Sequence, residues 1–267
     1  MTLDNFVSKI HEQAHAAYRD MPWRVSDKGG TFDGYKVLVS EFMLQQTQVS
    51  RVIPKYQYFL DKFPTITSLA NASLADVLLA WSGLGYNRRA KYLHEAAKIL
   101  QHVPQPWQYD DLVKCIGIGP NTANALRVYA YNLPEVFIET NIRTVYIHYF
   151  FTNSIKVDDK QILALVDKTM DRKSPRSWYW ALMDIGARLK NNNKNGLAKS
   201  ATYKKQPTFN GSLRQIRGLV LKSLVDGPCS ADKLSVVVND SRLDSVLLVL
   251  QSEGLISRDS KSYYLGG

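Results

Sequence analysis

The amino-acid sequence predicts a mainly α-helical protein that ends in a smaller α+β module, and three observations support this. From residue 5 to about residue 185, apolar residues recur at three- and four-residue spacing, as on the buried face of a helix. Alternating strand patterns are nearly absent from this region. Turn signals such as Pro64, Gly83 to Gly85, Pro104 to Pro106 and Pro134 separate the helical segments, as in a compact all-α domain.

The same spacing places the individual helices. The clearest apolar repeats predict helices over residues 35–43, 52–63, 74–80, 89–100 and 121–131. Near the end of the chain we expect helices over residues 212–225, 230–237 and 241–252, then a two-stranded hairpin that turns at 259–261. Three helices followed by a hairpin resemble a winged helix-turn-helix module. Such a module either holds DNA through its third helix and hairpin or packs on the rest of the protein.

Composition indicates a globular protein with an anionic partner. The chain has 267 residues, 45% of them hydrophobic, and a formal net charge of +10, which favours nucleic acid or an anionic membrane surface. No apolar run is long enough for a membrane-spanning helix, and the N-terminus lacks the order of a signal peptide, so we expect no membrane contact and a cytoplasmic location. Cys115 and Cys229 lie too far apart in the sequence to suggest a disulfide framework or a four-cysteine metal site.

Much of the positive charge is concentrated between Asp184 and Asp226. No acidic residue lies between them, and nine basic residues do: Arg188, Lys190, Lys194, Lys199, Lys204, Lys205, Arg214, Arg217 and Lys222. The centre of this stretch is polar, so we interpret residues 188–211 as a basic linker. It is either a solvated connector or a segment that follows DNA phosphates.

A glycine-containing turn precedes the predicted helix at 121–131. Gly117 and Gly119 flank Ile118, and only glycine lets a backbone approach a phosphate this closely. The amides of Asn121 and Thr122 at the helix start would then face the anion, with the helix dipole adding to the attraction. This is the arrangement of a helix-hairpin-helix element, which grips the DNA backbone without reading sequence. An ordinary interhelical turn is the alternative, and a structural cation at the hairpin stays open.

Three segments before this turn carry a family resemblance. They are Met21 to Arg24, the SEFMLQQTQV sequence of residues 40–49, and the WSGLGY sequence of residues 81–86. With the hairpin, they resemble the MutY-type adenine glycosylases of the HhH-GPD superfamily over about residues 5–187. The resemblance implies the two-subdomain helical HhH-GPD glycosylase fold and duplex DNA as the partner. We also expect the protein to be a monomer and to be associated with the nucleoid.

The resemblance also implies a domain division. The glycosylase domain would span residues 1–187, with a six-helix subdomain at about 30–134 and a second subdomain made of 1–29 plus 135–187. The basic linker, 188–211, and the winged-helix-like domain, 212–267, would follow.

An enzyme of this kind rotates its target nucleotide out of the duplex, which costs a few kcal/mol and leaves a gap to be filled. Gln45, Gln46 and Tyr86 stand at the family's positions for that task. A core aromatic and a solvated helix face are the structural alternatives for these residues. The remaining positions that the resemblance assigns to the base pocket are Trp23, Arg24 and Asn121.

Excision of adenine needs a proton for the leaving base and a negative charge opposite the cationic sugar. Glu41 matches the family's general acid and would need a raised pKa in a partly apolar pocket. Glu139 stands where the family has aspartate, and Asn141 keeps the family's asparagine two residues later. The extra methylene of Glu139 displaces the carboxylate, and a shift of about 1 Å can cost roughly a hundredfold in rate. Three explanations for glutamate at position 139 stay open. In order of preference they are a pocket rebuilt around a different sugar or base pose, a slow enzyme, and a DNA-binding regulator without catalysis.

Two further departures concern the lyase reaction and the cofactor. Asn121 falls where bifunctional relatives carry a Schiff-base lysine, so the resemblance implies base removal without efficient strand cleavage. The family's four cysteines are missing, so no iron–sulfur cluster is expected. Lys190, Lys194 and Lys199 would replace the cluster loop's positive charge near the DNA backbone.

Substrate identity stays open at this point. The family's separate domain for the base opposite adenine is not recognisable here, so another damaged, deaminated or hypermodified base, including one in phage DNA, is an alternative substrate. His11, Glu12 and His15 match a zinc-protease pattern, but no convincing third ligand follows, and we expect no metal site.

Overall fold

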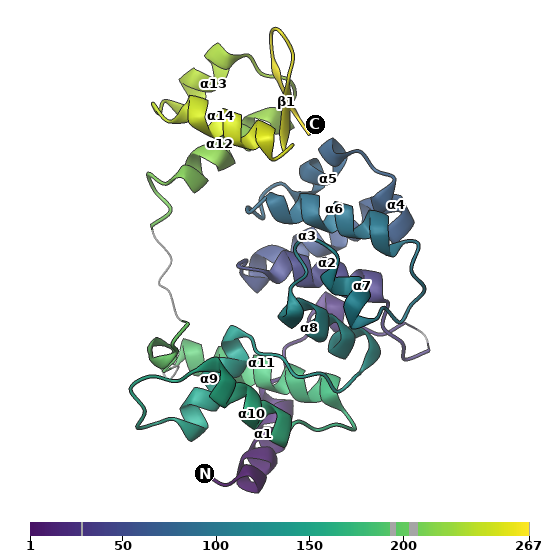
Figure 1. Cartoon of the computed structure of the whole chain (residues 1–267), viewed down its shortest axis with the longest axis vertical. Helices are drawn as coiled ribbons and strands as arrows, with labels where there is room; N and C mark the ends of the chain where they lie inside the picture. Colours follow the sequence, from purple (N-terminus) through teal and green to yellow (C-terminus); the bar gives the residue numbers. More distant parts are fainter. Residues whose placement is uncertain (28, 193–195, 203–207, 267) are drawn as a thin grey trace. The chain divides into compact units, whose positions relative to one another are not determined.

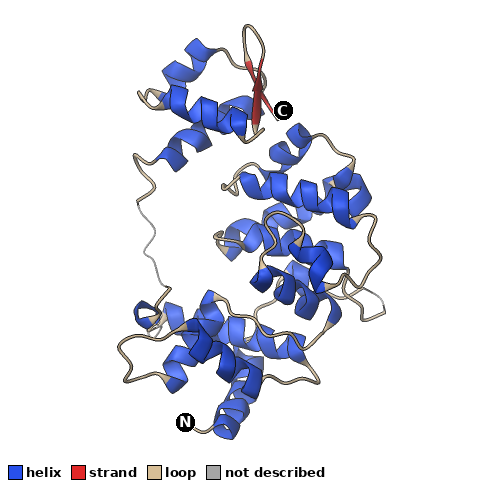
Figure 2. Cartoon of the chain, viewed as in Figure 1, coloured by secondary structure: helices blue, strands red, loops and turns tan. Residues whose placement is uncertain are grey.

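The computed structural model describes residues 1–27, 29–192, 196–202 and 208–266. Helices dominate it, and two short strands lie near the C-terminus (Figure 2). Figure 1 labels the helices of the chain, which divides into two compact units. The first comprises Met1–Val37, Gln105–Lys114 and Ile118–Lys205, and the second comprises Leu38–Pro104, Cys115–Gly117 and Gln206–Gly267. Helix α2, Gly34–Leu44, begins in the first unit and ends in the second.

The first unit is built around one long helix, α11 (Pro175–Asn191), against which α1 and α9 pack. Its other elements are α1 (Leu3–Ala17), the 3-10 helix η1 (Pro22–Arg24), α7 (Tyr109–Val113), α8 (Pro120–Tyr131), α9 (Thr140–Phe150), α10 (Asp159–Thr169) and the 3-10 helix η2 (Leu197–Lys199). Aromatic rings are part of its core. Phe6 lies 5.0 Å from Tyr146 and 4.9 Å from Phe150 between ring centroids. Buried aromatic rings contribute a large apolar area to a core.

One glycine sets how closely α9 and α11 approach each other. A Cβ added at Gly186 of α11 would lie 2.3 Å from the backbone oxygen of Asn141 in the first turn of α9. Any larger residue would push the two helices apart.

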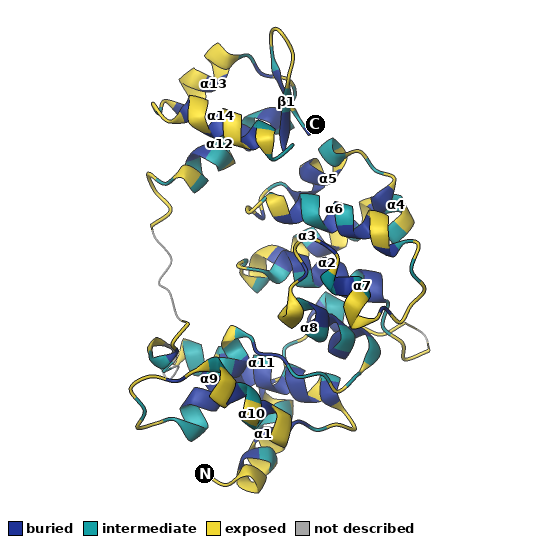
Figure 3. Cartoon of the chain, in the orientation of Figure 1, coloured by how far each residue is buried: buried dark blue, intermediate teal, exposed yellow. Residues whose placement is uncertain are grey.

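The second unit combines the end of α2 with four helices and the C-terminal module. Its elements are α3 (Val49–Lys62), α4 (Ile66–Ala70), α5 (Leu74–Trp81), α6 (Arg88–Leu100), α12 (Leu213–Val225), α13 (Ala231–Val238), α14 (Leu243–Ser252), β1 (Ile256–Arg258) and β2 (Tyr263–Leu265). The two strands are antiparallel, with Ser257 opposite Tyr264. Figure 3 shows buried residues on α5 and α6. Trp81, at the end of α5, is buried.

These elements confirm the predicted fold class, a mainly helical chain with a small C-terminal sheet. The three helices and hairpin of the winged-helix-like module begin and end within two residues of the predicted positions. The predicted linker is partly structured: α11 continues to Asn191, and Ser200 pairs as an isolated bridge with Val157. Helices α7 and α8 belong to the first unit, whereas we expected them in the subdomain of residues 30–134.

Among the described residues, no helix is long and apolar enough to cross a membrane.

Candidate functional site

One buried arginine holds the two turns that carry Gln45, Gln46 and Tyr86. Arg89, in the first turn of α6, is 7% exposed. Its Nη1 donates to the carbonyl oxygens of Phe42, at 2.8 Å, and Met43, at 3.0 Å, and also to that of Gln45. These are carbonyls at the end of α2, where an α-helix lacks internal donors and its dipole is negative.

The other half of the Arg89 guanidinium reaches the second turn. Nη2 donates to the Gly85 carbonyl oxygen at 3.0 Å and to the Thr47 hydroxyl at 2.9 Å. Burial lowers the pKa of Arg89 to about 10, which leaves it charged at neutral pH. The planar fork of an arginine suits such bridging of two loops, whereas a lysine offers one compact centre. Sequence pattern alone does not distinguish this residue from Arg88 beside it.

The residues on these two turns adopt a backbone conformation that side chains rarely take. Gln46 has φ of 55° and Tyr86 has φ of 50°, both in the left-handed region. Such conformations cost of order 1 kcal/mol or more and persist where the surroundings enforce them, frequently at functional sites. Tyr86 is 39% exposed, so it is not the core aromatic considered as its alternative. Gln46 is exposed and Gln45 half-buried.

The predicted hairpin is formed by α7, the turn after it, and α8. Gly117 has φ of 90°, and a Cβ there would lie 2.9 Å from the side chain of Tyr92, so the fold requires glycine at this position. Gly119 is different: it caps α8 with φ of −85°, and a Cβ would meet nothing within 4 Å. Packing therefore does not require glycine at position 119, and the absence of a side chain leaves the surface at the start of α8 open. Ile118 is 4% exposed, so only its backbone remains for a partner.

Helix α8 presents a polar first turn beside this open surface. Asn121 is exposed and Thr122 half-buried. The first amides of an α-helix have no internal acceptor, which makes this end of α8 suited to an anion.

Glu139 is the N-cap residue of α9 in the first unit, with extended backbone. The nearest arginine along the chain, Arg143, is paired with Asp159, to which its Nε and Nη2 donate at 2.8 and 2.7 Å. The side chain of Glu139 is half-buried, and loss of hydration raises the pKa of its carboxyl to about 7. A helix N-terminus favours the ionised form of a carboxyl, so the field of α9 acts against this shift.

Asn141 connects the start of α9 to α11. Its Nδ2 donates to the Met183 carbonyl oxygen at 3.1 Å, and its Oδ1 accepts from Nζ of Lys190 at 3.3 Å. Burial, and then the charge of Arg19, lower the pKa of Lys190. Lys190 is thus in contact with Asn141, which lies two positions after Glu139 in the sequence.

Glu41 lies on α2 and is half-buried, between the buried residues Ser40 and Phe42. The two carboxylates that the sequence singles out therefore belong to different compact units, Glu41 to the second and Glu139 to the first.

Arg24 has a structural environment. It is 8% exposed, and its Nη1 and Nη2 donate to the two Asp184 carboxylate oxygens at 2.6 and 2.9 Å. Arg19 donates to the same carboxylate from its backbone N, at 3.1 Å, and its Nε, at 2.7 Å. The Arg24 guanidinium is thus committed to an ion pair that ties η1 to α11, and not to the base contact that we expected. Trp23 beside it is half-buried.

The basic residues expected near the DNA backbone differ in their surroundings. Lys199 donates to the carbonyl oxygens of Phe151, at 3.4 Å, and Thr152, which caps the end of α9. Lys190 contacts Asn141, as described above. Lys194 lies outside the described residues.

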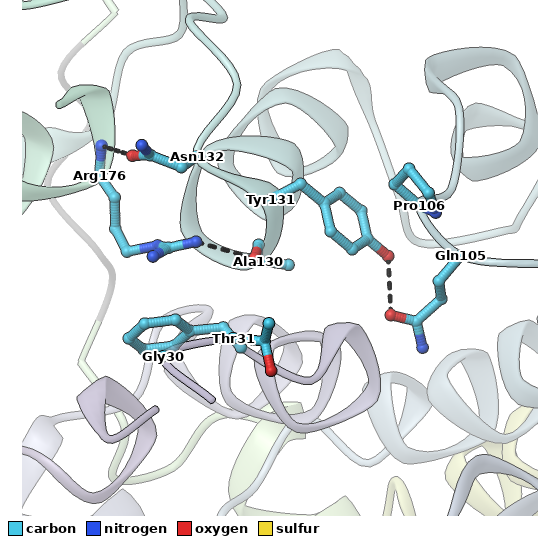
Figure 4. Close-up of a pocket in the computed structure, with 9 residues that line it drawn as sticks. Gly30, Thr31, Gln105, Pro106, Ala130, Tyr131, Asn132 and Arg176 are labelled. Atoms are coloured by element: carbon cyan, nitrogen blue, oxygen red, sulfur yellow. Dashed lines mark hydrogen bonds between the residues drawn. The ribbon is translucent and has the colours of Figure 1, made fainter. Parts of the chain in front are cut away.

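The metal and pocket candidates do not add to this site. His11, Glu12 and His15 lie on α1, and within the described ranges no three His, Cys, Asp or Glu side chains lie together as a metal site would need. A surface pocket of about 560 Å³ lies by the end of α8 and the start of α11, and Figure 4 shows its lining. The cation that lines it, Arg176, donates to the carbonyls of Tyr129 and Ala130 and so caps α8.

Comparison with known proteins gives a consistent result. A family model described as HhH-GPD superfamily base excision DNA repair protein matches residues 39–178. The adenine DNA glycosylase of Mycolicibacterium smegmatis is 32% identical over 91% of this chain and 89% of that enzyme. The adenine DNA glycosylase of Buchnera aphidicola subsp. Baizongia pistaciae is 38% identical over 65% of this chain, but the match spans only 49% of that enzyme.

Solved structures show the same fold at lower identity. A thermostable thymine-DNA glycosylase has a TM-score of 0.63 at 22% identity, over 73% of this chain and 90% of that one. A 3-methyladenine DNA glycosylase of H. pylori has a TM-score of 0.56 at 13% identity, over 72% of this chain and 99% of that one.

Proposed function

The chain belongs to the HhH-GPD superfamily of base excision DNA repair proteins, and on that premise we propose that it is a DNA glycosylase that excises adenine from duplex DNA. The observation that carries the proposal is the pair of exposed turns that Arg89 holds together. They present Gln46 and Tyr86 in strained backbone conformations on the surface. A rigid pair of side chains at the surface is what filling the gap of an extruded nucleotide requires.

The chemistry assigns one role to each carboxylate. Glu41 donates a proton to a ring nitrogen of the base, so that the electron pair of the breaking N-glycosidic bond leaves with a neutral base. Glu139, once ionised, faces the positive charge that develops on the sugar. Water then adds to the sugar carbon and loses a proton, which leaves an abasic site. Asn141 and Lys190 support the start of α9 and so fix the backbone at Glu139.

The proposed reaction ends at the abasic site. Asn121 is exposed at the start of α8, and an amide nitrogen does not form the Schiff base that strand cleavage requires. The proposed reaction does not use an iron–sulfur cluster. Both cysteines are buried and unbridged, Cys115 in the turn after α7 and Cys229 beside β2. Lys190 and Lys199 supply positive charge on the first unit in its place. We further propose a monomer that acts at the nucleoid on double-stranded DNA.

The test is single-turnover excision on a panel of duplexes, with alkali to reveal abasic sites. The panel holds adenine opposite 8-oxoguanine, guanine and cytosine, together with deaminated and glucosylated bases. We expect adenine to be released by the unaltered protein and not by Glu41→Gln or Glu139→Gln. The matched control is Glu95→Gln, which removes an exposed carboxylate from α6 and should leave the rate unchanged.

Other outcomes would change the assignment. Release of another base alone would keep the glycosylase class and replace the substrate. Tight duplex binding with no release from any member of the panel would contradict the proposal and favour a DNA-binding regulator, the interpretation that the glutamate at position 139 supports.

A further inference from the structure

One residue, Glu253, joins the C-terminal module to α6. Glu253, at the end of α14, accepts hydrogen bonds from Arg88 of α6 and Arg217 of α12, and its carbonyl oxygen accepts from Nζ of Lys91 at 2.6 Å. The Glu253 side chain is 12% exposed. Burial opposes its ionisation, but the bonds from the two arginines outweigh burial and lower the pKa of Glu253. Such a partly buried network is stronger than a solvated surface pair.

A second contact joins the end of the chain to α5. Gly266, just after β2, has φ of 78°, and a Cβ there would lie 2.9 Å from the backbone nitrogen of Ala75 in α5. The module therefore contacts α5 as well as α6. Two separate contacts restrict rotation of the module relative to these helices more than one contact would.

The outward face of α14 does not suit DNA. Its exposed side chains are Asp244, Ser245, Leu248, Val249 and Ser252. None is basic, and Arg242, just before the helix, is paired with Asp240 at 2.7 Å. A recognition helix in a DNA groove needs cations or polar groups for phosphates and base edges. The contacts described above show the module packed on α5 and α6.

The first turn of α12 supplies the link to the candidate site. Nη1 of Arg214 donates to the Tyr86 hydroxyl at 3.0 Å, across 128 positions of sequence. On the other side, the guanidinium carbon of Arg89 lies 5.4 Å from the centre of the Tyr86 ring. Tyr86 is thus contacted at its hydroxyl by the C-terminal module and at its ring by α6.

We propose that the C-terminal module acts as a positioning element for base extrusion, in which Arg214 fixes the Tyr86 side chain before DNA binds. The inference rests on the proposed function, because Tyr86 matters only if a nucleotide is extruded. Fixing a side chain in one conformation costs conformational entropy. If the Tyr86 side chain is ordered before DNA binds, the extrusion step does not bear this cost. The corresponding factor for one side chain is about three- to tenfold.

The experiment compares full-length Arg214→Ala with Lys222→Ala, which removes the same charge from the same helix about 12 Å further along its axis. Single-turnover excision is measured at saturating duplex, and extrusion is followed by the fluorescence of 2-aminopurine at the target position. We expect Arg214→Ala to lower both by about three- to tenfold with duplex affinity and melting temperature near those of the unaltered protein. Lys222→Ala should lie within about twofold of the unaltered protein.

Tyr86→Phe provides the decisive comparison, because it removes the hydroxyl and keeps the ring. If Arg214 acts through that hydroxyl, the double variant is no slower than Tyr86→Phe alone. If the two substitutions instead lower the excision rate independently, so that their effects multiply, and duplex binding depends less on salt, Arg214 contacts a phosphate and the inference is overturned. An Arg214→Ala variant of full activity would also overturn it. Both results leave the glycosylase assignment standing. Failure of the unaltered protein to release any base would overturn the assignment and the inference together.

Discussion

Replacement of Arg89 by methionine tests whether this side chain holds the two turns. The variant keeps an unbranched chain in the space but removes the guanidinium donors to the carbonyls of Phe42, Met43 and Gly85. An unsatisfied buried carbonyl costs about 1–3 kcal/mol, and two of these carbonyls lie at the buried end of α2. Because methionine carries no charge, the variant no longer pays the desolvation cost of the buried guanidinium, and this offsets part of the loss. We expect the free energy of unfolding to fall by about 2–4 kcal/mol.

The assay is urea unfolding followed by helical circular dichroism, alongside single-turnover excision at a temperature where the variant is folded. Excision should fall with stability, because the turns that carry Gln46 and Tyr86 lose their common anchor. Arg89→Lys should recover only part of the loss, since one ammonium cannot reach both turns as the fork does. Lys98→Met on the same helix, where the exposed pair with Glu95 contributes little, is the control. An Arg89→Met variant within about 0.5 kcal/mol of the unaltered protein, with full activity, would refute the reasoning.

The remaining predictions concern the first unit and the hairpin. Asp184→Asn leaves Arg24 without its ionic partner and should lower the free energy of unfolding by about 3–5 kcal/mol, measured by chemical denaturation. Because the pKa of Glu139 is raised to about 7 in the folded protein, its carboxyl penalises folding as pH rises from about 4.5 to 7. Glu139→Gln should therefore gain stability relative to the unaltered protein over that window, whereas the excision rate of the unaltered protein should rise through pH 7 as the carboxylate forms. A stability difference that does not vary with pH would contradict the shift. Gly117→Ala should lower the melting temperature, because of its positive φ and the 2.9 Å clash; Gly119→Ala should leave it unchanged and weaken duplex binding alone, and equal melting losses would contradict the distinction.

Local pattern predicted most of the fold because helices and hairpins are set by neighbouring residues. Helices α12, α13 and α14 and the hairpin of β1 and β2 begin and end close to the expected positions, since apolar spacing and turn residues lie within each segment. The same holds for the turn at Gly117, where both the glycine and the helix start that follows are visible in the sequence. The candidate residues of the catalytic reaction, Glu41 and Glu139, came from family resemblance.

Residues whose role depends on distant partners could not be identified in this way. Arg24 stands in a motif that resembles a base pocket, yet its ion pair with Asp184 joins residues 160 positions apart. The linker prediction likewise could not include the pairing of Ser200 with Val157, which depends on a segment more than 40 residues earlier.

Arg88 and Arg89 show where the limit lies. The sequence by itself determined that a basic helix follows the turn with Tyr86, and it gave both arginines the same chemistry. Only the tertiary structure decided their roles: the side chain of Arg88 is 54% exposed and pairs with Glu253, whereas Arg89 is buried against the end of α2 and both turns. Consecutive residues on an α-helix point about 100° apart, so which one faces the core depends on what packs against the helix.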